Sequence, residues 1–349
     1  MDKFWCEVDL QKLLENIAIL NNINDKKTIA VVKGNAYGLG IEEITNFLQD
    51  KVDMFAVYSI KEADKIKVYK DILILSPDIE YDRLKDLKKN YILSIGNLEV
   101  LEKFHKDSNY RCHIYVDTGM NRLGIKPEDV KYYVNYIKEN CLNVKLEGIY
   151  THLHNSSKIN YTKRQIINFK NSIESVKSQF EYIHCLSSNS IINKEYREIA
   201  KFTNTVRVGN ILYGYSGMSF GFKPIYSMYC KIMYDYYVDR GESIGYGNLY
   251  RTKRKTKVGV VNIGTIDNIG VIRQRRQNFV IHILKTAYKY FFKSSYIYYN
   301  NKKLDIIGNP SMNYTLVDIT GIDYKKSHKL KVNICPTICD TSLRKKYIS

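Results

Sequence analysis

Long apolar runs are missing from this sequence of 349 residues. No stretch of 18 residues is apolar throughout, so we expect no transmembrane helix. The N-terminal residues also lack a cationic start followed by an apolar run, since Asp2 and Glu7 flank Trp5. We therefore expect no signal peptide and no membrane partner.

Paired cysteines are also missing. The seven cysteines are scattered along the chain without a CxxC pair, and their number is odd. A disulfide framework needs paired cysteines, and a structural zinc site needs closely spaced ones. We therefore expect free thiols, no metal site and a reduced, cytoplasmic protein.

The formal net charge of +18 is unevenly distributed. From Gly221 to the end, the sequence has 23 Lys and Arg residues against 8 Asp and Glu residues, whereas residues 1–220 are close to neutral. Such asymmetry is one feature of a polyanion-binding surface. No nucleic-acid-binding motif accompanies it, so we expect no nucleic acid or other polyanion as partner and keep a basic binding module only as an alternative.

Short apolar stretches alternate with helical patterns over the first part of the chain. Many of these stretches are rich in β-branched residues, and the segments between them have the spacing of amphipathic helices. Eight strands separated by helices predict an α/β fold, the (β/α)8 (TIM) barrel. The predicted strands are 28–33, 54–58, 71–75, 91–95, 112–117, 145–150, 182–187 and 205–208. The predicted helices are 10–20, 41–49, 61–69, 80–89, 97–105, 127–139, 161–179 and 191–199.

Residues 28–40, TIAVVKGNAYGLG, place a lysine at the end of the first predicted strand. The apolar run ends at Lys33, a polar turn with glycines follows, and a helical pattern begins near Ile41. Functional groups of such barrels lie at the C-terminal ends of their strands. Partial burial there lowers the pKa of an ammonium group, and the free amine can form a Schiff base with an aldehyde.

Two later strand ends carry groups suited to an anion. In these barrels a phosphate is often held by the loops after the seventh and eighth strands. The turn SSNS (187–190) follows the seventh predicted strand and precedes a helix, whose N-terminal amides can bind an anion. Arg207 lies in the eighth strand, and Gly209 follows it. The sequence therefore places a reactive lysine and a phosphate site at the same end of one barrel.

Helical periodicity fades after Tyr213. Tyrosine-rich stretches of alternating polarity follow and predict a smaller, β-rich domain. These stretches are 225–238, 258–266, 278–284, 294–300, 303–307, 314–320 and 328–334. We expect the barrel domain to span residues 1–221 and the β-rich domain residues 222–349, with no low-complexity linker.

Several of these motifs resemble those of the alanine racemase family. The stretch AVVKGNAYGLG is similar, in nine of eleven positions, to the family motif that carries the lysine for pyridoxal phosphate (PLP). Further segments of the family have counterparts in the same order. They are VDTGMNRLG (116–124), GIYTHLHNS (148–156), the pair Asn189-Ser190 and VRVGNILYG (206–214). The resemblance covers nearly the whole chain and is weak after the barrel.

The resemblance implies a PLP site on the barrel. Lys33 would attach the cofactor and act as the base on one face of the substrate. Arg122 would bind the substrate carboxylate, and Met312 would also lie at the substrate. The residues implied to bind the cofactor are Lys33, Tyr37, Arg122, His152, Ser190, Arg207, Gly209 and Asn210. An arginine such as Arg207 that faces the pyridine nitrogen cannot accept its proton, which makes the ring a weaker electron sink.

The resemblance also implies an active homodimer, because the second base of the family is a tyrosine from the smaller domain of the partner subunit. Thr265 stands at the position of that tyrosine, and a threonine hydroxyl is a much poorer base than a perturbed phenol. Tyr246 is a second candidate for this base, although it matches a different family segment. Tyr115 stands where many members carry a carbamylated lysine.

These residues predict a PLP-dependent amino-acid racemase that interconverts L- and D-alanine. One alternative is a divergent PLP-binding homologue that has lost two-base racemisation. Such a homologue would either be non-catalytic or catalyse a one-base reaction on another amino acid.

Overall fold

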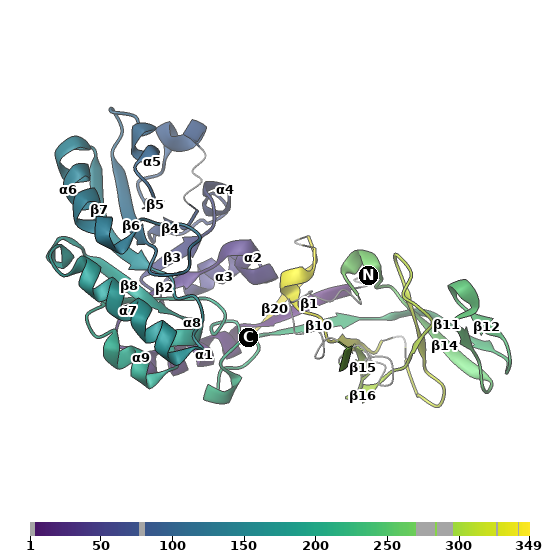
Figure 1. Cartoon of the computed structure of the whole chain (residues 1–349). Coiled ribbons are helices and arrows are strands. Elements are labelled where there is room, and N and C mark those ends of the chain that lie inside the picture. Colours follow the sequence, from purple (N-terminus) through teal and green to yellow (C-terminus); the bar gives the residue numbers. More distant parts are fainter. Residues whose placement is uncertain (1–3, 77–80, 270–282, 285–295, 326, 341) are drawn as a thin grey trace. The chain divides into compact units, whose positions relative to one another are not determined.

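The computed structural model describes residues 4–76, 81–269, 283–284, 296–325, 327–340 and 342–349 (Figure 1). The chain divides into two compact units. The barrel unit comprises residues 9–225, and the β unit comprises residues 4–8 together with the described residues from 226 to 348. Compared with the expected division into 1–221 and 222–349, residues 4–8 group with the β unit and residues 222–225 with the barrel unit.

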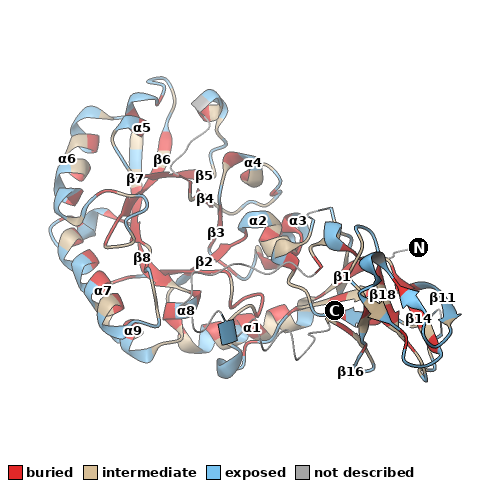
Figure 2. Cartoon of the chain, turned by 45° about the vertical axis from the view of Figure 1, so that its right-hand side comes forward, coloured by how far each residue is buried: buried red, intermediate tan, exposed pale blue. Residues whose placement is uncertain are grey.

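The barrel unit is a closed ring of eight parallel strands, which Figure 2 shows as buried strands surrounded by helices. The strands pair in chain order, and the ring closes where Ile29 of the first strand lies beside Arg207 of the last. All eight strands predicted from the sequence are confirmed: three have the predicted bounds, and the others differ by at most two residues at either end. They are β2 (Lys27–Val31), β3 (Met54–Val57), β4 (Ile72–Ile74), β5 (Tyr91–Ile95), β6 (Tyr110–Val116), β7 (Val144–Thr151), β8 (Tyr182–Ser187) and β9 (Thr205–Val208).

The helices of the barrel unit are amphipathic where they are long. In the first helix, Leu13, Ile17 and Leu20 form the buried face, and Asp9 caps the N-terminus by accepting a hydrogen bond from the Lys12 amide (2.9 Å). The helices are α1 (Leu10–Ile23), α2 (Lys33–Gly38), α3 (Ile41–Leu48), α4 (Ile60–Ala63), α5 (Glu99–Glu102), α6 (Val130–Asn140), α7 (Ile159–Ile173), α8 (Ser188–Ile191) and α9 (Lys194–Ile199).

Three predicted helices are much shorter in the structure. The helix predicted over 61–69 ends at Ala63, and residues 64–70 bury only Ile66, which is too little apolar surface to hold a longer helix. The helix predicted over 97–105 is reduced to α5, and that over 80–89 becomes the 3₁₀ helix η1 (Tyr81–Asp86).

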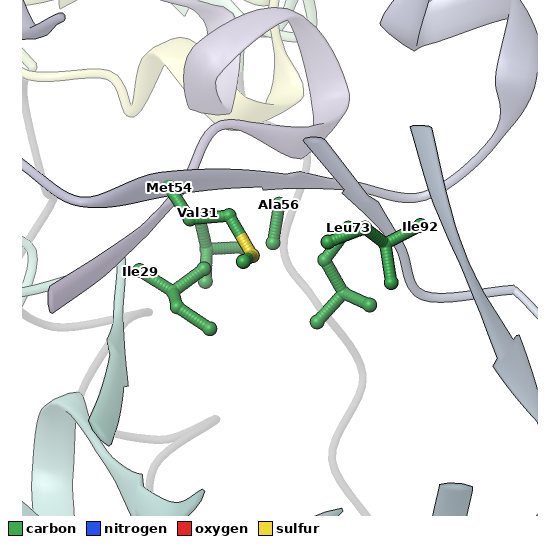
Figure 3. Packing of buried hydrophobic residues seen from close by; sticks show 6 residues of the cluster. All are labelled: Ile29, Val31, Met54, Ala56, Leu73 and Ile92. Carbon is green, nitrogen blue, oxygen red and sulfur yellow. The ribbon is translucent and has the colours of Figure 1, made fainter. Parts of the chain in front are cut away.

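A cluster of apolar side chains supports the strands that carry the candidate site (Figure 3). Alternate residues of a strand point to the same face, so β2 and β3 each contribute a pair of residues to this cluster. Burying an aliphatic side chain of this size stabilises the fold by roughly 1.5–3 kcal/mol. The cluster consists of Ile29, Val31, Met54, Ala56, Leu73 and Ile92.

The β unit contains a six-stranded sheet in the order β16-β15-β19-β10-β1-β20 and a four-stranded sheet in the order β11-β14-β18-β17. Strands β12 and β13 form a separate pair. The strands of the large sheet are β1 (Phe4–Asp9), β10 (Tyr226–Cys230), β15 (Ile297–Tyr299), β16 (Lys302–Lys303), β19 (Leu330–Val332) and β20 (Lys345–Ile348). The others are β11 (Ile232–Val238), β12 (Ser243–Ile244), β13 (Tyr250–Arg251), β14 (Thr256–Val261), β17 (Ile306–Ile307) and β18 (Thr315–Asp318).

The β-rich character predicted for the second half of the chain is confirmed, with two qualifications. Most of the predicted stretch 278–284 lies outside the described residues. Strand β1 is absent from the sequence-based predictions, yet it lies inside the large sheet, antiparallel to β10. In the part of the chain that the structure describes, no helix is both long enough and apolar enough to cross a membrane.

Candidate active site

Lys33 follows β2 and begins a turn of unusual backbone conformation. The four residues after it, Gly34 to Tyr37, all have left-handed angles, with φ between 52° and 62°. Glycine adopts such angles freely, whereas an L side chain costs roughly 1–2 kcal/mol per residue. Asn35, Ala36 and Tyr37 are therefore held in this conformation by their surroundings.

Hydrogen bonds fasten this left-handed turn at both ends. The Glu62 carboxylate of α4 accepts from the Gly34 amide (2.7 Å) and from the Tyr58 amide at the end of β3 (2.8 Å). The Tyr215 hydroxyl donates to the Tyr37 carbonyl (3.0 Å). Lys33 is thereby placed at the strand end that the sequence predicts.

A cavity of about 900 Å³ lies at the C-terminal ends of the barrel strands. Seven of the predicted site residues line it, and no aspartate or glutamate is among the described residues of its lining. The basic side chains in the lining favour an anionic ligand over a cationic one. The seven residues are Lys33, Tyr37, Arg122, His152, Arg207, Gly209 and Asn210.

The surroundings of Lys33 favour its uncharged amine. Burial lowers the pKa of Lys33, and the positive charges of Arg122 and Arg207 lower it further. The carboxylate of Glu62 raises this pKa but does not outweigh the other effects. A lysine with a lowered pKa has more free amine near neutral pH, which is the form that attacks a carbonyl group.

Arg207 is buried in the middle of a network of aromatic and histidine side chains. It donates to the Thr151 carbonyl (2.8 Å) and to Nδ1 of His184, and its guanidinium lies 4.4 Å from the centre of the Tyr150 ring. Because His184 accepts on Nδ1, its proton is on Nε2, which lies 3.1 Å from Nδ1 of His113. Burial, together with Arg207, holds the pKa of His184 well below its usual value, so the histidine is neutral.

His152 lies beside Arg207, at the end of β7. Its Nδ1 is 3.4 Å from the Arg207 guanidinium, so this nitrogen is an acceptor. Burial lowers the pKa of His152 to about 3, with further contributions from Arg207, Arg122 and Lys33. The site therefore presents a neutral imidazole beside permanently charged guanidinium groups.

The corner between β8 and β9 has the features of a phosphate site. A Cβ atom at Gly209 would lie 2.7 Å from the Tyr37 hydroxyl oxygen, so only glycine allows this close approach. Burial raises the pKa of Tyr37 to about 12, which keeps its hydroxyl protonated as a donor. The Ser188 hydroxyl accepts from the Gly209 amide (2.9 Å), so the proton of Ser188 remains available to an anion.

Ser190 is the one predicted cofactor-binding residue on the barrel that does not line the cavity. Its hydroxyl is fully buried, accepts from the Ser187 amide (2.7 Å) and donates to the Ser187 carbonyl (3.1 Å). The bond from the Ser187 amide is one half of the capping box of α8, and the Ser187 hydroxyl completes the box by accepting from the Ser190 amide. Ser187, Ser188 and Asn189 line the cavity instead, and they belong to the turn SSNS that the sequence indicates as an anion site.

Arg122 is carried by the loop that follows β6. The Asp117 carboxylate orders this loop by accepting from the amides of Gly119 (3.1 Å) and Asn121 (2.9 Å). At the end of this loop, Gly124 packs directly against the backbone of β6. Only a glycine fits there, because a Cβ atom would lie 2.8 Å from the Tyr115 carbonyl oxygen. The Arg122 side chain itself is exposed and lines the cavity.

Three further predicted residues lie in the β unit. Thr265 begins the 3₁₀ helix η6 (Thr265–Asp267), is exposed, and donates its amide hydrogen to the Ser311 carbonyl (2.9 Å). Met312 lies on that neighbouring turn and is 67% exposed. The structure thus brings Thr265 and Met312 onto adjacent turns. Tyr246 begins a separate 3₁₀ helix, η5 (Tyr246–Asn248).

The fold and the cavity define a class of protein: a (β/α)8 barrel whose lysine amine, with its lowered pKa, lines a cationic cavity suited to an anionic carbonyl compound. Family models then identify the chain more closely. Residues 8–217 match the model of the alanine racemase N-terminal domain, and residues 225–336 match that of its C-terminal domain. The chain belongs to the alanine racemase family.

Individual relatives agree with this assignment. The alanine racemase of Borreliella burgdorferi strain ZS7 is 31% identical over 331 residues, covering 89% of this chain and 83% of the relative. That of Aquifex pyrophilus is 31% identical over 327 residues, covering 91% and 85%. Among solved structures, the alanine racemase of Clostridium difficile 630 shares the fold with a TM-score of 0.83 and 23% identity, covering 99% of this chain and 96% of that one.

These comparisons confirm the family and the fold class expected from the sequence. They also favour a racemase over the alternative of a homologue that has lost two-base chemistry, because the relatives named here are alanine racemases over most of their length.

Proposed function

We propose that this chain is a PLP-dependent alanine racemase, active as a homodimer, that interconverts L- and D-alanine. The observation that carries the proposal is the cavity itself. It combines Lys33, whose pKa is lowered, with Arg122 and Arg207, and none of the described residues that line it carries a carboxylate. Such a cavity favours a ligand with several negative charges and a carbonyl group for the lysine.

The residues of the cavity fit PLP. Tyr37, Ser188 and Gly209 form a cradle in which a Cβ atom would not fit, and its donors suit a phosphate. Arg207 would face the ring nitrogen, and Lys33 would attach the cofactor. When bound, PLP supplies the electron sink that makes the α-hydrogen of an amino acid acidic.

The protein's own groups would then position the substrate and move its proton. Lys33 would take or return the α-hydrogen on one face, and Arg122 would hold the carboxylate. Arg207 cannot accept a proton from the ring nitrogen, because its guanidinium remains charged. The base on the opposite face would come from the β unit of the partner subunit, with Thr265 at the expected position and Tyr246 as the other candidate. Met312, on the turn beside Thr265, would lie at the substrate.

The decisive experiment measures interconversion of D- and L-alanine by the purified, PLP-loaded protein, with Lys33→Ala as the control. We expect a yellow protein that racemises alanine and a variant that loses both the colour and the activity. A wild-type protein that does not take up PLP would refute the proposal.

Hydrogen exchange separates the racemase from the one-base alternative. A protein that exchanges the α-hydrogen of alanine in D₂O but retains the configuration would have one working base and would not be a racemase. The cytoplasmic location remains a prediction, and it agrees with the presence of seven free thiols.

A further inference from the structure

The hydroxyl of Tyr115 is buried without a partner inside the candidate site. Tyr115 is 3% exposed, and its hydroxyl makes no hydrogen bond to any described residue. A buried polar group left without a partner is costly, and such groups are rare in folded proteins. Among the described residues, four buried polar atoms share this property, and only that of Tyr115 belongs to a residue lining the cavity.

The neighbours of Tyr115 hold its ring in one place. The ring stacks on Tyr150 with centres 4.8 Å apart and an angle of 5° between the planes. Tyr150 is fixed in turn by its hydrogen bond to Ser94 (2.9 Å) and by stacking on His184 at 4.9 Å. Stacking therefore holds the Tyr115 ring, and with it the hydroxyl, in one place.

The place of Tyr115 in the barrel indicates which part of a ligand it meets. β6, which carries Tyr115, lies four strands from β2 in either direction around the ring. The candidate phosphate cradle, formed by Tyr37, Ser188 and Gly209, lies at the ends of β8 and β9 and not at β6. Arg122 is on the loop directly after β6, and the chain returns to β6 through a bond from the Ile125 amide to the Tyr115 carbonyl (2.9 Å). The backbone of Tyr115 thus adjoins the loop that carries Arg122, while its ring lies against Tyr150.

We propose that Tyr115 is a substrate-binding residue whose hydroxyl, together with Arg122, binds the carboxylate of the amino acid. This inference rests on the proposed function, since it assigns a residue to the substrate of that reaction. A carboxylate oxygen completes the missing hydrogen bond of Tyr115, and the buried hydroxyl gains a charged acceptor. The same residue then explains why an unpaired hydroxyl is retained in the barrel.

Propionate binding to the PLP-loaded protein tests the inference, because propionate has the carboxylate of alanine but no amino group. Tyr115→Phe removes only the hydroxyl and keeps the stacked ring. We expect its dissociation constant for propionate, measured by calorimetry, to rise about tenfold, as for a lost hydrogen bond to a charged group. The KM for alanine is expected to rise similarly, with kcat changed far less.

Tyr110→Phe is a matched control on the same strand. Tyr110 is also buried, but its hydroxyl donates to the Leu84 carbonyl (3.3 Å) and accepts from the His105 amide (3.1 Å). We expect this control to melt at a lower temperature and to bind propionate normally. Tyr115→Phe loses no hydrogen bond to a described residue and is expected to melt at or above the wild-type temperature.

The outcomes distinguish this inference from the proposed function. A wild-type protein that takes up no PLP would refute both. A wild-type protein that takes up PLP, together with a Tyr115→Phe variant of unchanged propionate affinity, would overturn the role of Tyr115 alone. Equal losses of affinity in both variants would also overturn it, because they would reflect a general disturbance of β6.

Discussion

Replacing Glu62 with alanine is expected to loosen the left-handed turn that carries the candidate lysine. The carboxylate makes two short hydrogen bonds, to the amides of Gly34 (2.7 Å) and Tyr58 (2.8 Å). Each contributes about 1 kcal/mol, because the carboxylate is charged but only partly buried. These bonds act against the strain of the turn, which contains three non-glycine residues whose left-handed angles cost roughly 1–2 kcal/mol each. We therefore expect Glu62→Ala to lower the free energy of unfolding by about 2 kcal/mol.

The same change is expected to act on Lys33. Glu62 is the carboxylate that raises the pKa of Lys33, so its removal lowers this pKa further. A lower pKa increases the fraction of free amine at a given pH. The rate at which PLP-free protein forms its coloured complex is therefore expected to reach its plateau at a lower pH in Glu62→Ala than in the wild type.

Two variants make this prediction falsifiable. Glu62→Gln removes the charge but keeps one acceptor oxygen, so it is expected to lose about half of the stability and to show the shift in the pH profile. Glu42→Ala removes an exposed partner of Lys67 (2.8 Å) and is expected to change the free energy of unfolding by less than about 0.5 kcal/mol. Wild-type stability and an unchanged pH profile in Glu62→Ala would refute the reasoning.

Three further predictions concern other parts of the chain. Arg111→Leu leaves the buried carboxylate of Glu147 without its bidentate partner. We expect this change to lower the free energy of unfolding, measured in urea, by about 3–5 kcal/mol. A decrease of less than about 1 kcal/mol would contradict this expectation. Burial raises the pKa of Glu147, but hydrogen bonds from Arg111 and Lys145 outweigh it and leave the pKa below its usual value. Its stabilisation is therefore present above the unfolded pKa and lost as the pH falls through the lowered folded value, and acid unfolding of the Arg111→Leu variant should depend less on pH. Thr265→Tyr is expected to increase the racemase activity, and an unchanged rate would argue against Thr265 as the position of the second base.

The strands of the barrel could be predicted because each is buried on both faces. A run such as TIAVV or MFAVY is apolar and β-branched or aromatic throughout, and the polar turns between runs mark the ends. The positions of Lys33 and Arg207 follow directly from those ends.

Other features depend on contacts that the sequence does not display. The left-handed angles of Asn35, Ala36 and Tyr37 cannot be predicted from the neighbouring sequence, because none of these residues is a glycine. The turn is held by the Glu62 carboxylate of another helix, α4, which accepts a hydrogen bond from the Gly34 amide. Ser190 was expected to face a ligand, but the capping box with Ser187 occupies its hydroxyl. Both features depend on which groups meet after folding.

Strand β1 has a consequence for the order in which the chain acquires its structure. It pairs with β10, whose residues follow the whole barrel in the sequence, and the Cys6 amide donates to the Arg344 carbonyl (2.9 Å). During synthesis the barrel has all its strands once residue 208 has emerged, whereas β1 must wait for partners made more than two hundred residues later. Until then its apolar side chains have no partner strand to cover them, which makes this first strand a site of possible aggregation in a ribosome-bound nascent chain.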